Sequence, residues 1–125
     1  MIIGVWTDIV SIEKIKLIYN KFGDRFLDKI LTKEEKEYCR SFPDPNSHIA
    51  GKFAAKESVF KAAHSIEGLS MTWKDIEIKK HKNNAPYISL QGELKEYFEN
   101  FNTNVQISIS HSNSYAVGYA IIEVL

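Results

Sequence analysis

Three charged side chains of this chain have the types and the spacing that phosphate-transfer chemistry requires. Glu57 and Lys61 are four residues apart, so a helix over this segment places a carboxylate and an ammonium on one face. Asp8 follows a short apolar run at the N-terminus. Mg²⁺ prefers oxygen ligands and is held by one or two carboxylates together with substrate phosphates. If Asp8 and Glu57 meet in space, they can hold Mg²⁺, and Lys61 can contact a phosphate.

Each of these residues also has an ordinary structural interpretation. A Glu and a Lys four residues apart form a helix-stabilising pair worth about 0.2–0.5 kcal/mol. An Asp after a strand is often a turn or helix-capping residue. His111 lies in a polar turn after a strand-like segment, where it can bind phosphate, act as a base or be solvated. Spacing alone leaves open whether Asp8 and Glu57 lie together.

The first part of the chain, which must place Asp8, is expected to be one short strand followed by helices. The apolar run 1–5 predicts the strand, and Ser11 can cap a helix that ends at Gly23. A second short helix follows it. Thr32 and Glu35 have the spacing of a capping box and open a third helix, to about residue 40.

The central helix carries both Glu57 and Lys61. Asn46 or Ser47 is its expected cap, and it is expected to end before Gly68. Three large apolar residues define its expected buried stripe: Ile49, Phe53 and Phe60. With about 100° per residue, Glu57 and Lys61 fall at the edge of that stripe.

The last part of the chain is expected to form strands with one helix, over 93–101, between them. Four segments are predicted to be strands: 73–79, 87–90, 105–110 and 115–125. They pair as two hairpins, so the sheet is mainly antiparallel. The predicted fold class is therefore α+β, with the sheet packed against helices in one domain over 1–125.

Composition excludes several classes of function. Lys plus Arg and Asp plus Glu both number 16, so net charge gives no argument for a nucleic-acid or membrane partner. Cys39 is the only cysteine, which rules out an intramolecular disulfide and a cysteine-based zinc site; it is interpreted as a buried thiol. The N-terminus lacks the pattern of a signal peptide, and no apolar run reaches the roughly 20 residues of a membrane helix. A cytoplasmic protein is expected.

A locally basic region covers 14–33. The simplest interpretation of this region is a solvated helix face without a binding role. The sharper interpretation is a docking surface for an acidic protein, because opposite charge speeds the encounter of two proteins.

Six segments together resemble the holo-acyl-carrier-protein synthase family, the short 4′-phosphopantetheinyl transferases. The segments are 4–10 (Gly-Val-Trp-Thr-Asp-Ile-Val), 26–35, 50–62 (with Lys-Phe-Ala-Ala-Lys-Glu-Ser-Val-Phe-Lys), 73–78, Pro86 and 107–112 (Ile-Ser-Ile-Ser-His-Ser). They occur in the family's order and cover nearly the whole chain. The resemblance implies a 4′-phosphopantetheinyl transferase-like fold.

The resemblance also implies an activity. The 4′-phosphopantetheine arm of coenzyme A is transferred to a serine of apo acyl carrier protein in fatty-acid biosynthesis, and adenosine 3′,5′-bisphosphate is released. It implies Mg²⁺ held by Asp8 and Glu57, with Lys61 against the phosphates. Metal and lysine would offset charge on the leaving phosphate, so Glu57 and Lys61 are the catalytic candidates. Glu57, directly or through a water, is the first candidate for the group that accepts the serine proton.

The family is typically a homotrimer with active sites between subunits. By resemblance, coenzyme A is bound by Lys52, Lys61, Pro86, His111 and Ser112, with Pro86, His111 and Ser112 from the neighbouring chain. The residues expected to dock the carrier protein are Lys14, Lys21 and Arg25.

This sequence departs from the family's pattern at three places. Trp6 stands where a Gly is usual, and its ring could narrow the pocket next to Asp8. His64 replaces a small residue, and Asn84-Ala85 replaces the usual Gly-Lys before Pro86. None of these changes removes Asp8, Glu57 or Lys61.

Three other hypotheses remain open. One is a transferase for a secondary-metabolism carrier protein, which the short chain disfavours. Another is a non-catalytic trimeric module that binds coenzyme A or an acidic partner, which Trp6 favours. The last is a generic α+β domain in which Glu57 and Lys61 form only a salt bridge, which the ordered motifs disfavour.

Overall fold

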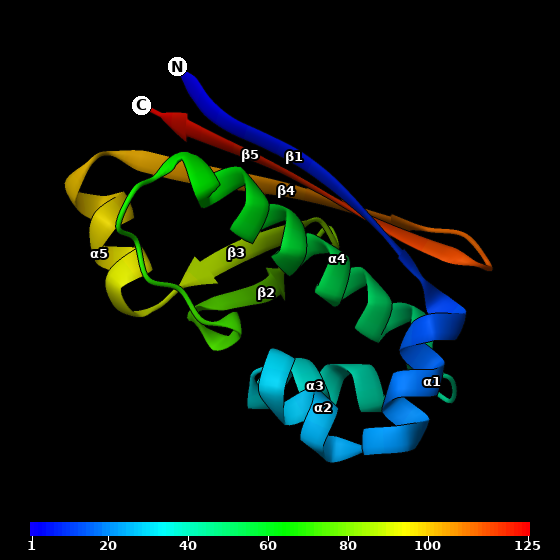
Figure 1. Ribbon diagram of the computed structural model, residues 1–125. Coiled ribbons are helices and arrows are strands. Elements are labelled where there is room, and N and C mark those ends of the chain that lie inside the picture. Colours follow the sequence, from blue (N-terminus) through cyan, green and yellow to red (C-terminus); the bar gives the residue numbers. More distant parts are fainter.

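The computed structural model describes residues 1–64 and 66–125 in full, and Figure 1 shows how their elements are arranged. The elements follow in the order β1 (Ile2–Ser11), α1 (Ile12–Phe22), α2 (Asp24–Ile30), α3 (Lys33–Arg40), α4 (Asn46–Ala62), η1 (Ala63–Ser65), η2 (Trp73–Asp75), β2 (Ile76–Lys80), β3 (Pro86–Leu90), α5 (Gly92–Asn100), β4 (Thr103–His111) and β5 (Tyr115–Val124). This order confirms the predicted α+β class.

The strands form two antiparallel sheets. One has the order β1-β5-β4, with β5 in the centre, and the other is the β2–β3 hairpin. The register places Asp8, Gly118 and Ile109 in one row across the larger sheet. Strand β1 is longer than the predicted 1–5, because residues as far as Ser11 pair with β5. Polar side chains interrupt its apolar pattern, so its second half did not resemble a strand.

Helix α4 lies along one face of the larger sheet, which we call the inner face (Figure 1). Two glycines of the sheet allow its backbone to come close. A Cβ on Gly4 would lie 2.3 Å from the Ala62 carbonyl oxygen, and a Cβ on Gly118 would lie 2.3 Å from the Ala54 carbonyl carbon. The helix backbone therefore rests on the sheet without intervening side chains at these two points.

The predicted apolar stripe of α4 packs against the core, but it is not the most deeply buried part of the helix. Ile49 is fully buried, but Phe53 and Phe60 are only partly buried and contact Trp73, with ring centroids 5.3 and 4.8 Å apart. The residues that the fold encloses on this helix are mostly small or polar: Ala50, Gly51, Lys52, Ala54, Ala55, Lys56, Ser58, Val59 and Ala62. Because α4 is covered by the sheet on one side and by other elements on the other, no single stripe marks its buried face.

Most predicted helix ends are confirmed, but α4 differs. Ser11 Oγ accepts a hydrogen bond from the Lys14 backbone, and Thr32 and Glu35 form the predicted capping box. Neither Asn46 nor Ser47 caps α4; Pro45 holds the N-cap position and makes no side-chain cap. The helix ends at Ala62, after which η1 follows.

The predicted strand over 73–79 is wrong in its first three residues. Residues 73–75 form the short helix η2, so the first strand of the hairpin is β2 from Ile76. Cys39 is fully buried, as expected. Among the described residues, none of the helices combines the length and the apolar character needed to cross a bilayer.

Candidate functional site

The structure brings Asp8, Glu57 and Lys61 together at one edge of α4. The Lys61 Nζ atom lies 3.0 Å from Asp8 Oδ1 and 3.7 Å from Glu57 Oε2. Asp8 comes from the inner face of β1, and the other two come from successive turns of α4. These three residues are called the carboxylate–lysine cluster below. Asp8 and Glu57, whose proximity the spacing left open, both contact the Lys61 ammonium.

The cluster is accessible to a ligand and has a definite charge pattern. The exposed fractions of its side chains are 15% for Asp8, 26% for Glu57 and 40% for Lys61. The hydrogen bond from Lys61 to Asp8, together with both carboxylate charges, raises the pKa of the Lys61 ammonium despite some loss of hydration. Lys61 therefore stays cationic. Its Nζ atom also lies 5.6 Å from the centre of the Trp6 ring.

The donor set suits a hard divalent cation. Two carboxylates converge on a point that already accommodates one positive charge, the Lys61 ammonium. Within residues 1–64 and 66–125 no group of three or more His, Cys, Asp or Glu side chains is placed to hold a metal. Further ligands for a cation at Asp8 and Glu57 would have to be water or substrate oxygens, which is how Mg²⁺ is commonly bound.

A second group of predicted residues lines a pocket of about 200 Å³ on the other side of α4. Lys52, Pro86 and His111 all line it within one chain, whereas the resemblance implied that Pro86 and His111 meet the Lys52 of a neighbouring chain. Other lining residues include Tyr38, His48, Lys80 and Asn84. This site is called the Lys52 pocket below.

Tyr38 orients the two lysines of the Lys52 pocket. The Lys52 and Lys80 ammonium groups lie 4.8 and 4.9 Å from the centre of its ring, and Lys80 also donates a 2.5 Å hydrogen bond to its hydroxyl. Lys52 is almost wholly buried. Two ammonium groups held by cation–π contacts make the pocket suited to an anionic ligand.

His48 adds a titratable group to the same pocket. Its ring stacks on Phe42, with centroids 3.6 Å apart, and lies 6.2 Å from the ring of His111. Burial lowers the pKa of the His48 imidazole, and the nearby His111, Lys80 and Lys52 lower it further. A negative charge in the pocket would reverse part of this effect.

Helix α4 separates the cluster from the pocket within one chain. Asp8 and Ile109 lie on either side of Gly118 in the row that passes beneath α4, and Ile109 lines the Lys52 pocket. Lys52 and Glu57 are five residues apart, about 140° around the helix. One chain therefore presents the cluster and the pocket at two different edges of its central helix.

The remaining predicted residues lie elsewhere. Ser112 does not line the Lys52 pocket; its Oγ accepts hydrogen bonds from the backbone of Ser114 and Tyr115 in the β4–β5 turn. Lys14 and Lys21 are exposed on α1, and Arg25 is exposed in the first turn of α2. Leu17, also exposed, lies between the two lysines on the same helix face.

Sequence reasoning missed Tyr38, His48 and Lys80. Tyr38 and Lys80 come from α3 and β2, and only the packing of these elements against α4 brings them to Lys52. His48 lies on α4 four residues before Lys52, a spacing that places both side chains on one helix face and could have indicated it.

Comparison with known proteins gives consistent matches over the whole chain. A family model, the 4′-phosphopantetheinyl transferase superfamily, matches residues 4–120. The holo-acyl-carrier-protein synthase of Protochlamydia amoebophila is 39% identical over 121 residues, which are 97% of this chain and 98% of that protein. The holo-acyl-carrier-protein synthase structure from Neisseria meningitidis has a TM-score of 0.87 and 29% identity, over 98% of this chain and 99% of that one. The Helicobacter pylori synthase, solved in complex with coenzyme A, has a TM-score of 0.81 and 35% identity, over 95% and 99%.

Proposed function

This chain belongs to the 4′-phosphopantetheinyl transferase superfamily, and we propose that its carboxylate–lysine cluster is the metal- and phosphate-binding part of the transfer site. It is an enzyme of fatty-acid biosynthesis. It transfers the 4′-phosphopantetheine group of coenzyme A to a serine of apo acyl carrier protein, and adenosine 3′,5′-bisphosphate is the other product. The matches over nearly the full length of both chains support this activity.

One observation carries the assignment of the site. Asp8 and Glu57, 49 positions apart along the printed sequence, both approach the Lys61 ammonium, at 3.0 and 3.7 Å. We assign Asp8 and Glu57 as ligands of Mg²⁺. Held by these two carboxylates, Mg²⁺ would supply positive charge that offsets the negative charge of the substrate phosphates.

The residues of the cluster have separate tasks in the transfer. The Lys61 ammonium, kept charged by Asp8, stabilises negative charge that develops on the leaving phosphate. Glu57 is within reach of the same region and accepts the proton of the attacking serine, directly or through a water. Positioning and electrostatics supply most of the rate in phosphoryl transfer, and a cluster held between a helix and a strand is suited to both.

The Lys52 pocket is assigned to the anionic part of coenzyme A. Its two lysines and two histidines surround a volume suited to a phosphate group. Because α4 separates this pocket from the cluster in one chain, we assign the complete site to two neighbouring subunits of a homotrimer, in which one subunit supplies the cluster and the other supplies Pro86 and His111. Ser112 is assigned to the same edge, beside His111.

The outer face of the larger sheet is the proposed subunit contact. Figure 1 shows the helices on the inner side of this sheet, and no described element covers its outer face. Four large residues of that face are exposed: Val5, Ile9, Tyr115 and Tyr119. Light scattering should give the mass of three 14.3 kDa chains, and Ile9→Lys should give a smaller particle with little transfer activity. A monomeric wild type with full activity contradicts this assignment.

Lys14, Lys21 and Arg25 are assigned to carrier-protein docking. All three are exposed, and Leu17 offers an apolar contact between the two lysines. Because this surface is separate from the cluster, a Lys14→Glu/Lys21→Glu variant should raise KM for the carrier more than it lowers kcat.

We place the enzyme, as one transferase domain over 1–125, in the cytoplasm, where its substrates are made.

The decisive experiment is mass spectrometry of an apo acyl carrier protein after incubation with this enzyme, coenzyme A and Mg²⁺. The expected product carries the phosphopantetheine group. Asp8→Ala or Glu57→Ala should abolish transfer while circular dichroism shows an intact fold, and the exposed carboxylate variant Glu96→Ala should keep wild-type turnover. Coenzyme A binding without an adduct on any of several carrier proteins would instead show a non-catalytic binding module.

A further inference from the structure

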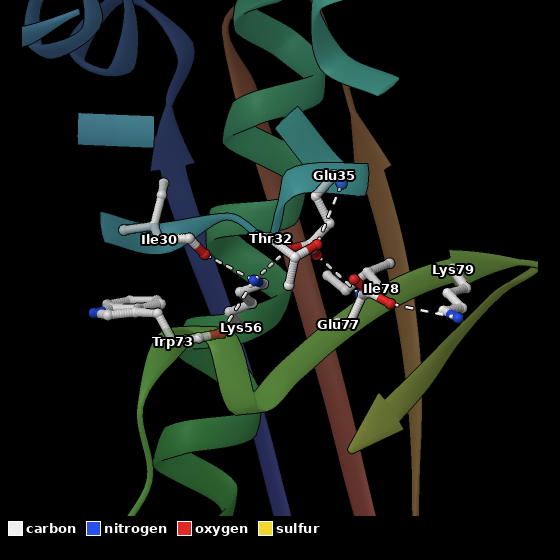
Figure 2. Close-up of polar contacts among 8 residues, drawn as sticks. All are labelled: Ile30, Thr32, Glu35, Lys56, Trp73, Glu77, Ile78 and Lys79. Carbon is white, nitrogen blue, oxygen red and sulfur yellow. Dashed lines mark hydrogen bonds and ion pairs between the residues drawn. The ribbon is translucent and has the colours of Figure 1, made fainter. Parts of the chain in front are cut away.

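A buried ion pair lies one residue away from Glu57. Lys56 Nζ is 2.6 Å from Glu35 Oε1, and the exposed fractions of the two side chains are 0% and 1% (Figure 2). Neither residue belongs to the carboxylate–lysine cluster, and Lys56 is fully buried, out of reach of a substrate, although Glu35 borders a pocket beside Lys52. The pair therefore needs an explanation other than direct chemistry.

Every hydrogen of the Lys56 ammonium has an acceptor. Besides Glu35, it donates to the Ile30 carbonyl at 2.7 Å and to the Trp73 carbonyl at 3.1 Å, as Figure 2 shows. An ammonium has three donors, so the set is complete. Burying two charges costs hydration free energy, and an apolar pair of similar size is often at least as stabilising. What these contacts add is direction: they fix where the Lys56 side chain points.

Glu35 extends these contacts to two further segments. Its Oε1 atom accepts a 2.8 Å hydrogen bond from the Thr32 backbone, and its Oε2 atom accepts a 2.9 Å hydrogen bond from the Ile78 backbone. The pair thus connects the end of α2, the start of α3, the middle of α4, η2 and β2. Apart from α4 itself, these segments pack on the side of α4 away from the larger sheet (Figure 1).

The position of Lys56 in α4 makes this anchor relevant to the cluster. Lys56 and Glu57 are consecutive, so their side chains leave the helix about 100° apart. At a side-chain radius of about 5–6 Å, a 20° rotation of α4 would move the Glu57 carboxylate by about 2 Å. Displacements of about 1 Å can cost 10²-fold in rate when reacting groups must be aligned.

We propose that the Lys56–Glu35 pair is a positioning device of the transfer site, which fixes the rotation of α4 and thereby directs Glu57 toward Asp8. The proposal rests on the proposed function, because it takes Glu57 as a metal ligand. It assigns no contact with substrate to either residue. The Glu57–Asp8 alignment should therefore depend on a pair that lies on a different face of the helix.

The test replaces the pair by neutral residues of similar shape in the full chain, Lys56→Met/Glu35→Gln. Binding of Mn²⁺ alone is measured by electron paramagnetic resonance, without coenzyme A or carrier protein, and transfer kinetics are measured separately. Loss of a group that orients a metal ligand typically costs about 10–100-fold in metal affinity or activity. We expect Mn²⁺ binding and kcat to fall in that range, with KM for the carrier changed less than about twofold.

The matched control is Ile49→Ala, which removes a fully buried apolar side chain from the same helix without touching the pair. It should lower the unfolding midpoint and leave Mn²⁺ binding and kcat within about twofold of wild type, since a cavity destabilises without redirecting Glu57. If Ile49→Ala loses as much Mn²⁺ binding and kcat as the double variant does, any destabilisation of α4 disturbs the cluster. That result would overturn the proposal.

The remaining outcomes are also decisive. A folded double variant with wild-type Mn²⁺ affinity and kcat overturns the proposal. If the double variant does not fold, Mn²⁺ affinity and kcat are measured in Glu35→Gln alone. If neither variant folds, the pair serves stability alone, and the proposal is overturned. If the wild type transfers no phosphopantetheine, the proposed function fails. If it transfers but binds no Mn²⁺, only the metal assignment and this proposal fail.

Discussion

Gly118 in β5 and Ala54 in α4 are in backbone contact. A Cβ on Gly118 would lie 2.3 Å from the Ala54 carbonyl carbon, closer than two non-bonded carbons can approach. The row that contains Gly118 also contains Asp8. The missing side chain at Gly118 therefore sets the distance between α4 and the strand that carries Asp8, and with it the reach of Lys61.

We expect Gly118→Ala to destabilise the protein and to reduce transfer. The added methyl must push α4 away from the sheet, and overpacking of this kind costs about 1–3 kcal/mol. Urea unfolding measures the stability, and the transfer assay measures the activity. Gly51→Ala is the comparison for stability, because its Cβ would meet only the Ile109 side-chain methyl, at 3.1 Å. A Gly118→Ala protein with wild-type stability would show that the contact is not restrictive.

Trp6 is expected to support Lys61 without being required for transfer. An exposed cation–π contact such as that of Trp6 with Lys61 is worth about 0.5–1 kcal/mol. Trp6→Gly should therefore lower kcat/KM by about two- to fivefold, since 1.36 kcal/mol is tenfold. Trp73→Phe, away from the cluster, should leave kcat/KM unchanged. Loss of more than about fiftyfold in Trp6→Gly would show that the ring contacts substrate.

The His48 imidazole should report ligand binding in the Lys52 pocket. Burial and the surrounding cations hold its pKa below the ordinary 6.5 in the free protein. Adenosine 3′,5′-bisphosphate brings negative charge, so it should raise the His48 pKa, and by linkage it should bind more tightly as pH falls. An NMR titration of the histidine side chains checks the shift.

The same residue predicts a sign for stability at mild acid pH. Because the folded-state pKa of His48 is lowered, its contribution to stability is present above pH 6.5 and is lost as pH falls through the folded value. His48→Gln should remove both the extra acid sensitivity and the pH dependence of nucleotide binding that belong to this group. A His48 signal that does not move on nucleotide addition contradicts the assigned pocket.

Cys39 should make the protein less stable at alkaline pH. Burial raises the pKa of its thiol from 9.0 to about 11. The thiol stays neutral in the folded state while the unfolded state ionises, so stability is full below pH 9 and is lost as pH rises toward 11, by about 2–3 kcal/mol. Urea unfolding at pH 8 and pH 10.5 measures the loss. In Cys39→Ala the difference between the two pH values should be smaller by about 2 kcal/mol, because most of the loss is reached at pH 10.5; an equal difference would contradict the shift.

Signals that are local in the sequence predicted their elements well. The Thr32–Glu35 spacing and Ser11 predicted helix starts that the structure contains, and the alternation over 105–109 predicted β4. Such signals depend on groups within a few residues of each other, so the rest of the fold does not alter them. The start of α4 was predicted within two residues, but its expected cap at Asn46 or Ser47 was wrong, because Pro45 holds the N-cap position and no side chain caps the helix.

The buried face of α4 could not be predicted from its apolar residues. Small residues such as Ala54 face the sheet because Gly118 lets the backbones touch, and size rather than apolar character selects them. Lys56 looks like a surface residue in the sequence, yet it is fully buried because Glu35 lies beside it. That partner is 21 residues away, and no periodicity within α4 indicates it.

The candidate site was predicted by residue type but not in its arrangement. Asp8, Glu57 and Lys61 meet, as their chemistry suggested. The separation of the carboxylate–lysine cluster from the Lys52 pocket depends on the path of α4 over the sheet, and the place of Tyr38 in that pocket depends on how α3 packs against α4. These are tertiary relationships, for which one sequence offers no local pattern.

The two oxygens of the Glu35 carboxylate have a consequence for the order of folding. Oε1 closes the capping box with Thr32, a contact that a short stretch of chain can form on its own. Oε2 receives the Ile78 backbone from 43 residues away, and Lys56 arrives from 21. The cost of burying the Glu35 carboxylate is offset only when the Lys56 ammonium and the Ile78 backbone N–H are both in place. Docking of β2 and closure of α3 onto α4 should thus be one cooperative event, visible as a single hydrogen-exchange unit that contains Glu35, Lys56 and Ile78.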